Sequence, residues 1–415
     1  QKRTRVRPHQ RQHGIAGGDV NHLNIAAQVT GNPVEIMGGK AGTGGDVEFV
    51  ARLADHGQVS LNPAFGVQHL GIDQAADGAV DIPGGNPVQR LGGIGALDQE
   101  LAKAGLVDDH GPFPRGLVFA ANGVCRFAVN RRNNPEAEID GLSELKGPSD
   151  HAVPVLKITD PEGKQVRAVL FGYACHATVL SGYQWCGDYP GFAMIALEEA
   201  APGMAALFFQ GCGANQNPLP RRSVPLARQY GRELATAVQR VLEEENYARE
   251  LPAELQQAYG VATIETEAVP PRETLEKIAR EHGTPYMRKA AAELLAIWDR
   301  DGRLPESAEY PMHVWNIGGQ PLVAFAGETV VDYALRAKKL LGKDAFVMGY
   351  CDDIMSYIPT ADIIREGGYE GESSQLIYGF AAKWREDIES RICGLLVALA
   401  GEAGCHVTPD AEPIP

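Results

Sequence analysis

Polar side chains that follow apolar segments of this sequence have the chemistry that hydrolytic sites use. They are an imidazole, carboxylates, amides and phenols: His176, Asp188, Asn215, Asn217, Glu328, Tyr357 and Tyr369. A histidine nitrogen, a carboxylate oxygen and a phenol oxygen from distant segments could together bind zinc, which keeps one position for water in catalytic sites. The structural alternative is that His176 is a hydrogen-bonded core residue beside an apolar strand.

The stretch over residues 166–218 predicts the unit that positions several of these side chains. Two apolar runs, residues 168–173 and 205–209, have the length of buried strands, and each leads into a polar loop. Between them Asp188, followed by Pro190, indicates the start of a helix. Because polar loops at the carboxyl ends of neighbouring strands converge on one crevice, we expect a site there.

The rest of the chain predicts further strands and helices around that unit. Alternating apolar residues indicate a hairpin over residues 152–174, and Asn122-Gly123 is a strong hairpin dipeptide between two short strands. The other predicted elements are a helix over 223–245, a strand over 258–269, two helices within 272–301, a hairpin over 313–326, a helix from Glu328 to Gly342, a strand over 345–350 and a helix over 374–400. At a helix N-terminus, Glu328 would also complement the helix dipole.

The composition disfavours some classes of partner. The chain has 415 residues, of which 44% are hydrophobic and 22% charged, with a net charge of −15 and a pI near 5.2. This acidic balance disfavours nucleic acid or an anionic membrane surface as a partner. No apolar run approaches the ~20 residues that span a bilayer. The basic N-terminus lacks the apolar core of a signal peptide, so the sequence as it stands does not support export.

The cysteine pattern favours thiols over a disulfide framework. The seven cysteines are at positions 125, 175, 186, 212, 351, 393 and 405, and they form no Cys-x-x-Cys pair. Because the number is odd, full pairing is impossible. We expect mostly buried, reduced cysteines, with a Cys175–Cys212 or Cys186–Cys212 bridge as the alternative.

Residues 1–113 differ in composition from the rest of the chain. They contain no Cys, Tyr or Trp, yet they carry six of the eleven histidines and many glycines. No glycine cluster follows a clear strand and opens a clear helix, which disfavours a phosphate-binding loop. We predict an atypical region that is disordered or not native to the fold, with a glycine-rich repeat domain as the alternative. The ordered domain is predicted over 114–405, followed by a flexible tail over 406–415.

Seven short segments between residues 117 and 374 resemble a known family. They are FAVNRR, GYACHATVL, GDYPG, FFQGCGANQNP, the Gly327-Glu328 pair after a strand, SYIPTA and GGYEGESS. In this order and spacing they look like the N-terminal catalytic domain of the neutral/alkaline, non-lysosomal ceramidase family, in the shorter form of bacterial ceramidase-like proteins. The resemblance implies an α/β fold of mixed β-sheets flanked by helices. Such proteins are usually secreted or periplasmic.

The resemblance also implies a mechanism and roles for individual residues. The family is similar in using one zinc held by two His, a Glu and a Tyr, with a metal-bound water attacking the amide of an N-acyl sphingosine. By matched position, His176, Glu328 and Tyr357 would be metal ligands. Arg131 would hold the oxyanion or a polar head group. Asp188 would stand behind the ligands, and Asn215 and Asn217 would contact the substrate.

The sequence departs from the family in three places. The other histidine ligand of the family lies in a His-Thr-His-Ser-Gly-Pro segment that has no counterpart here. His110 lies only twenty residues before Asn130, and His56 and His69 lack the motif. The family's Gly-Asp-Val-Ser-Pro-Asn loop is replaced by residues 213–218, which lack its Asp and Ser. No C-terminal β-sandwich is expected after the last helix.

These observations predict a zinc-dependent hydrolase of the neutral ceramidase type. The expected substrate is an N-acyl bond of a ceramide-like sphingolipid, or a related amide or ester. The expected cofactor is Zn²⁺, and a small-molecule or lipid amide is the expected partner, without nucleic acid. The alternative is a non-catalytic member that binds a lipid or glycan and has an incomplete metal site.

Overall fold

The first β-sheet contains both strands of the predicted strand–helix–strand unit. In this computed structural model, the strands pair in the order β10-β4-β6-β7-β8. Their bounds are Val118–Val124 (β4), Ala152–Thr159 (β6), Val166–Tyr173 (β7), Ala205–Gln210 (β8) and Arg249–Leu251 (β10). The neighbours are antiparallel except for β7 and β8, which are parallel. Helix α2 (Asp188–Ala200) connects these two strands, as predicted.

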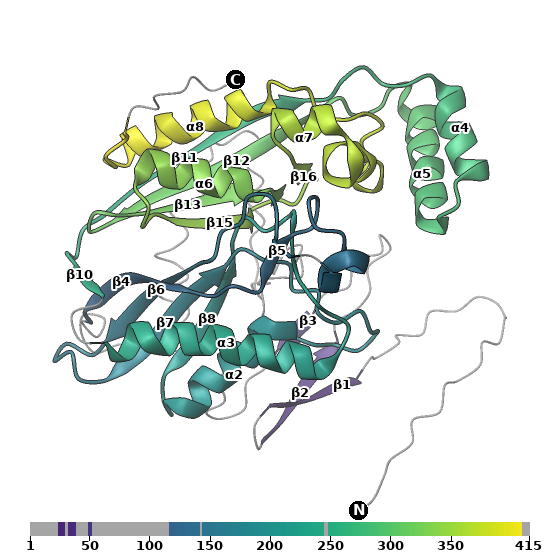
Figure 1. The fold of residues 1–415 in the computed structure, drawn as a ribbon. Helices are drawn as coiled ribbons and strands as arrows, with labels where there is room; N and C mark the ends of the chain where they lie inside the picture. The colour runs from purple at the N-terminus through teal and green to yellow at the C-terminus, as the bar shows by residue number, and fades with distance from the viewer. Residues whose placement is uncertain are drawn as a thin grey trace, which may run out of the picture. The chain divides into compact units, whose positions relative to one another are not determined.

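Helices α2 and α3 cover one face of this sheet (Figure 1). α3 (Val224–Glu243) begins at Ser223, whose hydroxyl accepts a hydrogen bond from the backbone N–H of Leu226. Apolar side chains of β7, such as Phe171, pack with Leu234 and Val238 of α3, and all three are fully buried. This apolar core fixes β7 and β8, and therefore the loops that follow them.

A second sheet has a similar plan. Its strands pair in the order β11-β12-β13-β15, and only the last pair, β13 and β15, is parallel. The bounds are Leu255–Glu265 (β11), Ser307–Ile317 (β12), Gln320–Ala326 (β13) and Phe346–Cys351 (β15). Helices α6 (Val331–Leu341) and α8 (Ile388–Glu402) pack on it. Between β11 and β12 the chain forms the two predicted helices, α4 (Arg272–Glu281) and α5 (Pro285–Asp301).

The two sheets contact each other through an apolar layer. Ala120 and Leu156 of the first sheet belong to one buried cluster with Leu322 and Phe346 of the second. The described core is therefore layered as helices, sheet, sheet and helices, which Figure 1 shows from the side. This architecture confirms the predicted α/β class of mixed sheets flanked by helices.

Short elements lie where the long strands end. β5 (Ala128–Asn130) pairs antiparallel with β9 (Gln216–Pro218), and β14 (Glu328–Thr329) pairs parallel with β16 (Tyr357–Ile358). Helix α7 (Ala361–Glu366) follows β16, and short helical segments occur at 136–141, 369–373 and 375–378. These short elements carry Asn217, Glu328, Tyr357 and Tyr369, which the sequence analysis singled out.

The structure describes residues 116–141, 143–244 and 248–408, and the backbone of three strands nearer the N-terminus. These strands, β1 (Asn24–Val29), β2 (Asn32–Gly38) and β3 (Phe49–Ala51), form an antiparallel sheet in that order. The chain divides into two units, residues 1–61 with 67–91, and residues 62–66 with 92–415. The predictions for residues 1–113 and for the end of the tail otherwise lie outside the described residues.

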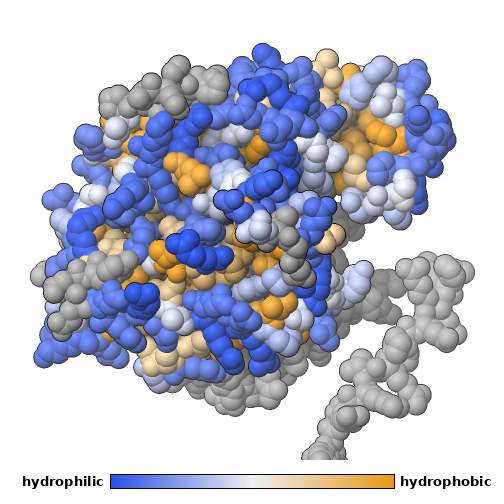
Figure 2. Space-filling view, in the orientation of Figure 1, coloured by the Kyte–Doolittle hydropathy of each residue, from blue (hydrophilic) through white to orange (hydrophobic). Residues whose placement is uncertain are grey.

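The described part of the chain has no helix long and apolar enough to cross a membrane. On the face that Figure 2 shows, hydrophilic residues dominate and apolar residues form scattered patches. The surface in this view therefore has no continuous apolar band.

The prediction of a hairpin at Asn122-Gly123 is wrong. Both residues lie inside β4, where they pair with Pro154 and Val153 of β6. The glycine allows close packing instead of a turn, because a Cβ on Gly123 would lie 2.8 Å from the carbonyl oxygen of Ala237 in α3. The sequence dipeptide thus reflects the approach of a helix to the sheet.

The last helix is shorter than predicted. α8 begins at Ile388 and not at Ser374. Gly379 has a φ of +90°, a left-handed conformation that interrupts a helix, and Trp384 forms an isolated bridge with Thr266. The segment before α8 therefore folds as turns, which brings Tyr378 to the site described below.

We predict that Gly123→Ala lowers the free energy of unfolding by about 1–3 kcal/mol, because the new methyl group would overlap the backbone of α3. Chemical denaturation of the purified full chain measures this. Gly283→Ala is the matched control, since nothing lies within 4 Å of its added Cβ. Equal unfolding free energies for the two variants would contradict the close packing at Gly123.

The structure confirms the prediction of cysteine thiols. None of the seven cysteines is in a disulfide; Cys186 is exposed, Cys351 and Cys405 are half-buried, and the other four are buried. Burial raises the pKa of Cys125 to about 12 and those of Cys175 and Cys212 well above the ordinary thiol value. A raised pKa leaves less of the reactive thiolate at neutral pH.

We therefore predict that one thiol, Cys186, reacts rapidly with Ellman's reagent at pH 8 in the native protein, and that the buried thiols react only after denaturation. Time-resolved absorbance of the released thiolate measures the number of fast thiols. The Cys186→Ser variant should lose the fast phase. A fast phase that persists in this variant would contradict the prediction, because it would show that a buried or half-buried thiol is accessible.

Candidate active site

The candidate site lies where the two parallel strand pairs end. The segments after β8 and after β13 are joined by a hydrogen bond from the N–H of Ala214 to the carbonyl of Thr329, 3.3 Å. Cys212, just after β8, donates its S–H to the carbonyl of Met348 in β15, 3.6 Å. The carboxyl ends of β7, β8, β13 and β15 thus meet, and their loops converge as expected for this class of sheet.

His176 follows β7 and is held from two sides. Its backbone N–H donates to Gln216 O at 3.0 Å, and its ring Nε2 lies 2.9 Å from the carbonyl oxygen of Ala214. Because a carbonyl only accepts, Nε2 carries the proton and Nδ1 keeps its lone pair. The hydroxyl of Tyr350 lies 3.2 Å from Nδ1 and donates its one proton to Glu328. Burial lowers the pKa of His176 to about 3, and the charge of Arg131 acts in the same direction. The imidazole is therefore neutral at physiological pH and able to offer a lone pair.

Glu328 lies beside His176. One carboxylate oxygen, Oε2, is 3.8 Å from His176 Nε2 and accepts a hydrogen bond from Tyr350 at 3.3 Å, and the other accepts from the hydroxyl of Tyr378. The side chain of Glu328 is 12% exposed. The predicted helix start at Glu328 is wrong, because α6 begins only at Val331 and Glu328 belongs to β14.

The turn before Glu328 explains this difference. Gly327 has a φ of +68°, and a Cβ there would lie 2.6 Å from the side chain of Ile358. The glycine therefore lets β14 approach β16 closely. Pairing of these strands sets Glu328 directly opposite Tyr357.

Tyr357 is held by a network of arginine and glutamate. Its hydroxyl accepts a hydrogen bond from Nη2 of Arg131 at 3.2 Å, and Nε of Arg131 donates to Glu370 at 2.7 Å. Burial raises the pKa of the Tyr357 phenol, as does the charge of Glu328, whereas Arg131 opposes both. The phenol is thus protonated unless a further cation favours its ionised form.

Glu370 connects two neighbouring arginines. It accepts from Arg131 with one oxygen and from Arg132 with the other, 2.8 Å, although its side chain is almost completely buried. Arg132 also pairs with the exposed carboxylate of Glu366, 2.8 Å. The polar run that contains both arginines is therefore part of an ion-pair network and does not form a freely solvated loop.

Asp188 holds the loop that follows His176. Its carboxylate accepts the backbone N–H groups of Val179 (3.2 Å), Leu180 (2.8 Å) and Tyr189 (2.8 Å). Burial raises the pKa of Asp188, and these three donors act against that shift. Asp188 therefore fixes the backbone of the segment that follows His176.

The two asparagines have different surroundings. Asn215 accepts the N–H of Val331 at 2.9 Å and donates to Asp332 at 3.4 Å, so both ends of its amide engage the start of α6. Asn217 is 4% exposed, and its Oδ1 has no hydrogen-bond partner. Of these two side chains, Asn217 therefore has the available hydrogen-bonding capacity.

The donors that converge are chemically suited to zinc. Within the described ranges no group of three or more His, Cys, Asp and Glu side chains could hold a metal ion. His176 and Glu328 nevertheless lie within 3.8 Å, and Tyr357 is paired with Glu328 in register. One imidazole nitrogen and two oxygens are ligand types of zinc, and three protein ligands are the number that catalytic sites use. The candidate second histidines, His56, His69 and His110, lie outside the described residues.

Three residues of this cluster were not selected from the sequence. Tyr350 ends the predicted strand over 345–350, so the rule that selected the other strand-end residues also applied to it. Tyr378 was assigned to a helix and therefore was not considered. Glu370 lies beside Tyr369, which was selected; the Tyr369 ring packs 5.2 Å from that of Tyr357, between ring centroids.

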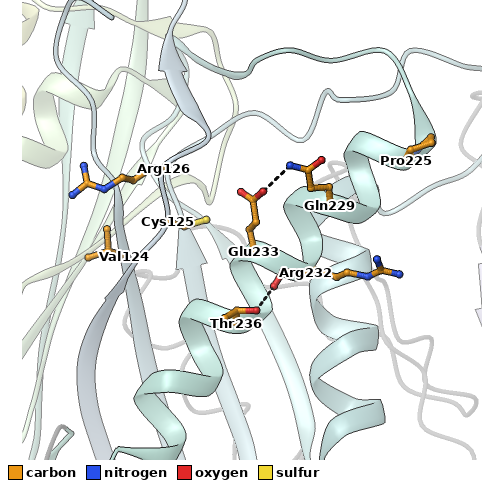
Figure 3. A pocket seen from close by; sticks show the side chains of 8 residues that line it. All are labelled: Val124, Cys125, Arg126, Pro225, Gln229, Arg232, Glu233 and Thr236. Atoms are coloured by element: carbon orange, nitrogen blue, oxygen red, sulfur yellow. Dashed lines mark hydrogen bonds between the residues drawn. The ribbon is translucent and has the colours of Figure 1, made fainter. Parts of the chain in front are cut away.

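Two hollows in the described surface lie away from this cluster. One of about 620 Å³ is lined by Val124, Cys125 and Arg126 and by side chains of α3, where Gln229 donates to Glu233 (Figure 3). In that view Arg126 and Arg232 extend away from each other. The other, of about 650 Å³, lies between β4, the start of β13 and the end of α6. Neither contains an imidazole, so we place the candidate site at His176.

We predict that Glu370→Gln destabilises the protein by about 3 kcal/mol, because it leaves two partly buried guanidinium groups without their shared carboxylate. The control is Glu366→Gln, the same chemical change at a carboxylate that also contacts Arg132 but is 64% exposed, and it should cost at most about 1 kcal/mol. Equilibrium denaturation measures both. A loss for Glu370→Gln no larger than that of the control would contradict the network.

Comparison with known proteins gives matches among solved structures. No protein-family model matches the sequence, and no curated protein does. A ceramidase complexed with C2 is 17% identical with a TM-score of 0.49, and the match covers 72% of this chain and 55% of that chain. A neutral ceramidase from Pseudomonas aeruginosa is 18% identical with the same TM-score, covering 72% of this chain and 54% of that chain. This chain thus spans about half the length of the solved structures it matches. Both are ceramidases, the family that the sequence motifs resemble.

Proposed function

We propose that the protein is a zinc-dependent hydrolase of the ceramidase type. The substrate would be the N-acyl bond of a ceramide-like lipid, or a related amide or ester. One observation carries the proposal: His176, Glu328 and Tyr357 come from three distant segments and lie together, with Glu328 3.8 Å from the imidazole and in register with the tyrosine. These three residues would hold the zinc.

Zinc at such a site would polarise the acyl carbonyl and lower the pKa of water to about 7. The protein groups prepare for this in two ways. Ala214 fixes the His176 tautomer, so that Nδ1 carries the lone pair. Arg131 donates to the Tyr357 oxygen, which favours the ionised phenol that a metal needs.

Arg131 is the group we assign to the acyl oxygen or to a polar head group. Its guanidinium is held by Glu370 and stacks over the rings of Tyr357 and Tyr369, at 5.7 and 5.4 Å from their centroids. Its side chain is 22% exposed, so part of the guanidinium is accessible. A donor fork fixed in this way stabilises developing negative charge without reorganisation.

The asparagines support the same assignment in different ways. Asn215 would position the loop after β8, because its amide is engaged with the start of α6. Asn217 would contact the substrate or orient water, since its buried carbonyl oxygen has no partner. Asp188 would keep the loop after His176 in place through its backbone hydrogen bonds.

A specific observation also favours the alternative of a binding protein without turnover. Tyr350 and Tyr378 both donate to Glu328, which gives each carboxylate oxygen a phenol partner. A carboxylate satisfied in this way is stable without a metal. The same aromatic surroundings would then bind a lipid or glycan.

We predict about one zinc per chain in the full-length protein after dialysis against a weak chelator, measured by elemental analysis. His176→Ala should lose the bound zinc and reduce hydrolysis of a short-chain N-acyl sphingosine by more than about 100-fold. Loss of a group that only orients a metal ligand already lowers metal affinity or activity by about 10–100-fold, and loss of the ligand itself should lower them further. The matched control is His282→Ala, at the end of α4, which should retain both zinc and activity.

The outcomes separate the two functions. Zinc retained in His176→Ala would contradict the assignment of His176. Zinc bound at full stoichiometry without release of fatty acid from amide or ester substrates would favour the binding protein.

A further inference from the structure

The loop over residues 181–187 exposes two large aromatic side chains. Tyr183 is 108% exposed and Trp185 is 97% exposed, more than any other large hydrophobic residue in the described part of the chain. All residues from 181 to 186 are exposed. Exposing an entire tryptophan side chain and an entire tyrosine side chain to water is unfavourable in free energy, and such residues mark surfaces that bind a partner.

The loop projects from a fixed base. Val179, which is fully buried, accepts the N–H of Arg222 at 2.7 Å. Asp188 accepts the N–H groups of Val179 and Leu180 on the other side of the loop. The two ends of the loop are therefore held in place by hydrogen bonds, and its exposed aromatic residues project from this fixed base.

The charge pattern of the loop limits the kinds of partner that it could bind. Its sequence, SGYQWCG, contains no acidic or basic residue. The whole chain carries a net charge of −15, which disfavours approach to an anionic surface. Tryptophan and tyrosine combine an apolar ring with a polar atom and concentrate at the boundary between lipid and water. An uncharged aromatic tip on an acidic protein thus fits an electrically neutral lipid surface.

We propose that this loop is a lipid-surface anchor, in which Tyr183 and Trp185 insert into the headgroup region of a zwitterionic lipid surface. The loop begins five residues after His176. Asp188, which holds the two ends of the loop together, also holds the segment after His176. Binding would therefore bring the candidate site to the lipid surface. This binding requires neither a metal nor turnover, so it goes beyond the proposed function and is independent of it.

The test uses the full chain and phosphatidylcholine vesicles, without substrate. Sedimentation gives the partition coefficient, and tryptophan fluorescence should shift to shorter wavelength on binding. The variant Tyr183→Ser/Trp185→Ser should partition at least about tenfold more weakly. The control, Leu255→Ser/Tyr259→Ser, removes exposed apolar side chains of β11, 65% and 53% exposed, and should bind like the unchanged protein.

Each outcome decides the proposal. Equal partitioning of both double variants would overturn it, as would a wild-type protein that does not bind phosphatidylcholine at all. Oligomers that dissociate in the Tyr183→Ser/Trp185→Ser variant, without vesicle binding, would assign the loop to a second copy of the chain. A fluorescence shift caused by a soluble short-chain amide alone would show that the loop covers its own site, which also overturns the proposal. Vesicle binding by a protein that neither binds zinc nor hydrolyses the amide would support this inference and contradict the proposed function.

Discussion

The buried carboxylate of Glu328 is the constraint on which the rest of the site depends. Glu328 is 9% exposed as a residue, and its charge must be compensated, because transfer of an unpaired carboxylate from water is very costly. The neutral imidazole of His176 lies 3.8 Å from one of its oxygens, and the phenols of Tyr350 and Tyr378 donate hydrogen bonds to them. The negative charge of Glu328 in turn contributes to raising the pKa values of Tyr350, Tyr357 and Tyr378, after burial. Glu328 thus holds its negative charge among protonated phenols, and a bound cation would compensate that charge.

The layered fold makes this arrangement possible. Each sheet ends in a parallel pair connected by a helix, β7 with β8 through α2 and β13 with β15 through α6. The apolar layer between the sheets aligns the two pairs, so that loops from both supply side chains to one point. The network from Arg131 and Arg132 to Glu370 then connects segments more than 230 positions apart in the sequence. Residues of the candidate site therefore also contribute to the stability of the fold in this region.

Much of the fold was predictable from local pattern. The unit of β7, α2 and β8, the hairpin of β6 and β7, and the break between α4 and α5 each follow from apolar spacing and from turn or cap residues. The errors arose where a tertiary contact overrides the local signal. Gly123 looks like a turn residue, yet it accommodates the backbone of α3. Glu328 looks like a helix start, yet the pairing of β14 with β16 places it in a strand.

The candidate site was predictable in part for the same reason. His176, Glu328 and Tyr357 follow strands or lie in family-like segments, so residue type and position selected them. Tyr378 and Glu370 reach the site only because turns at 369–378 fold back, which no periodicity indicates. Arg131 was selected by resemblance alone, and its partner Glu370 depends on a contact across 239 positions. Long-range pairs of this kind require the structure.

X-ray absorption at the zinc edge tests the central claim most directly. The account predicts that zinc bound to the full chain has a first shell of nitrogen and oxygen at about 2.0–2.2 Å, with the outer-shell scattering of imidazole. This pattern should be absent from the His176→Ala variant. A sulfur shell at about 2.3 Å would contradict the account, because it would place the metal on cysteines and not on His176, Glu328 and Tyr357.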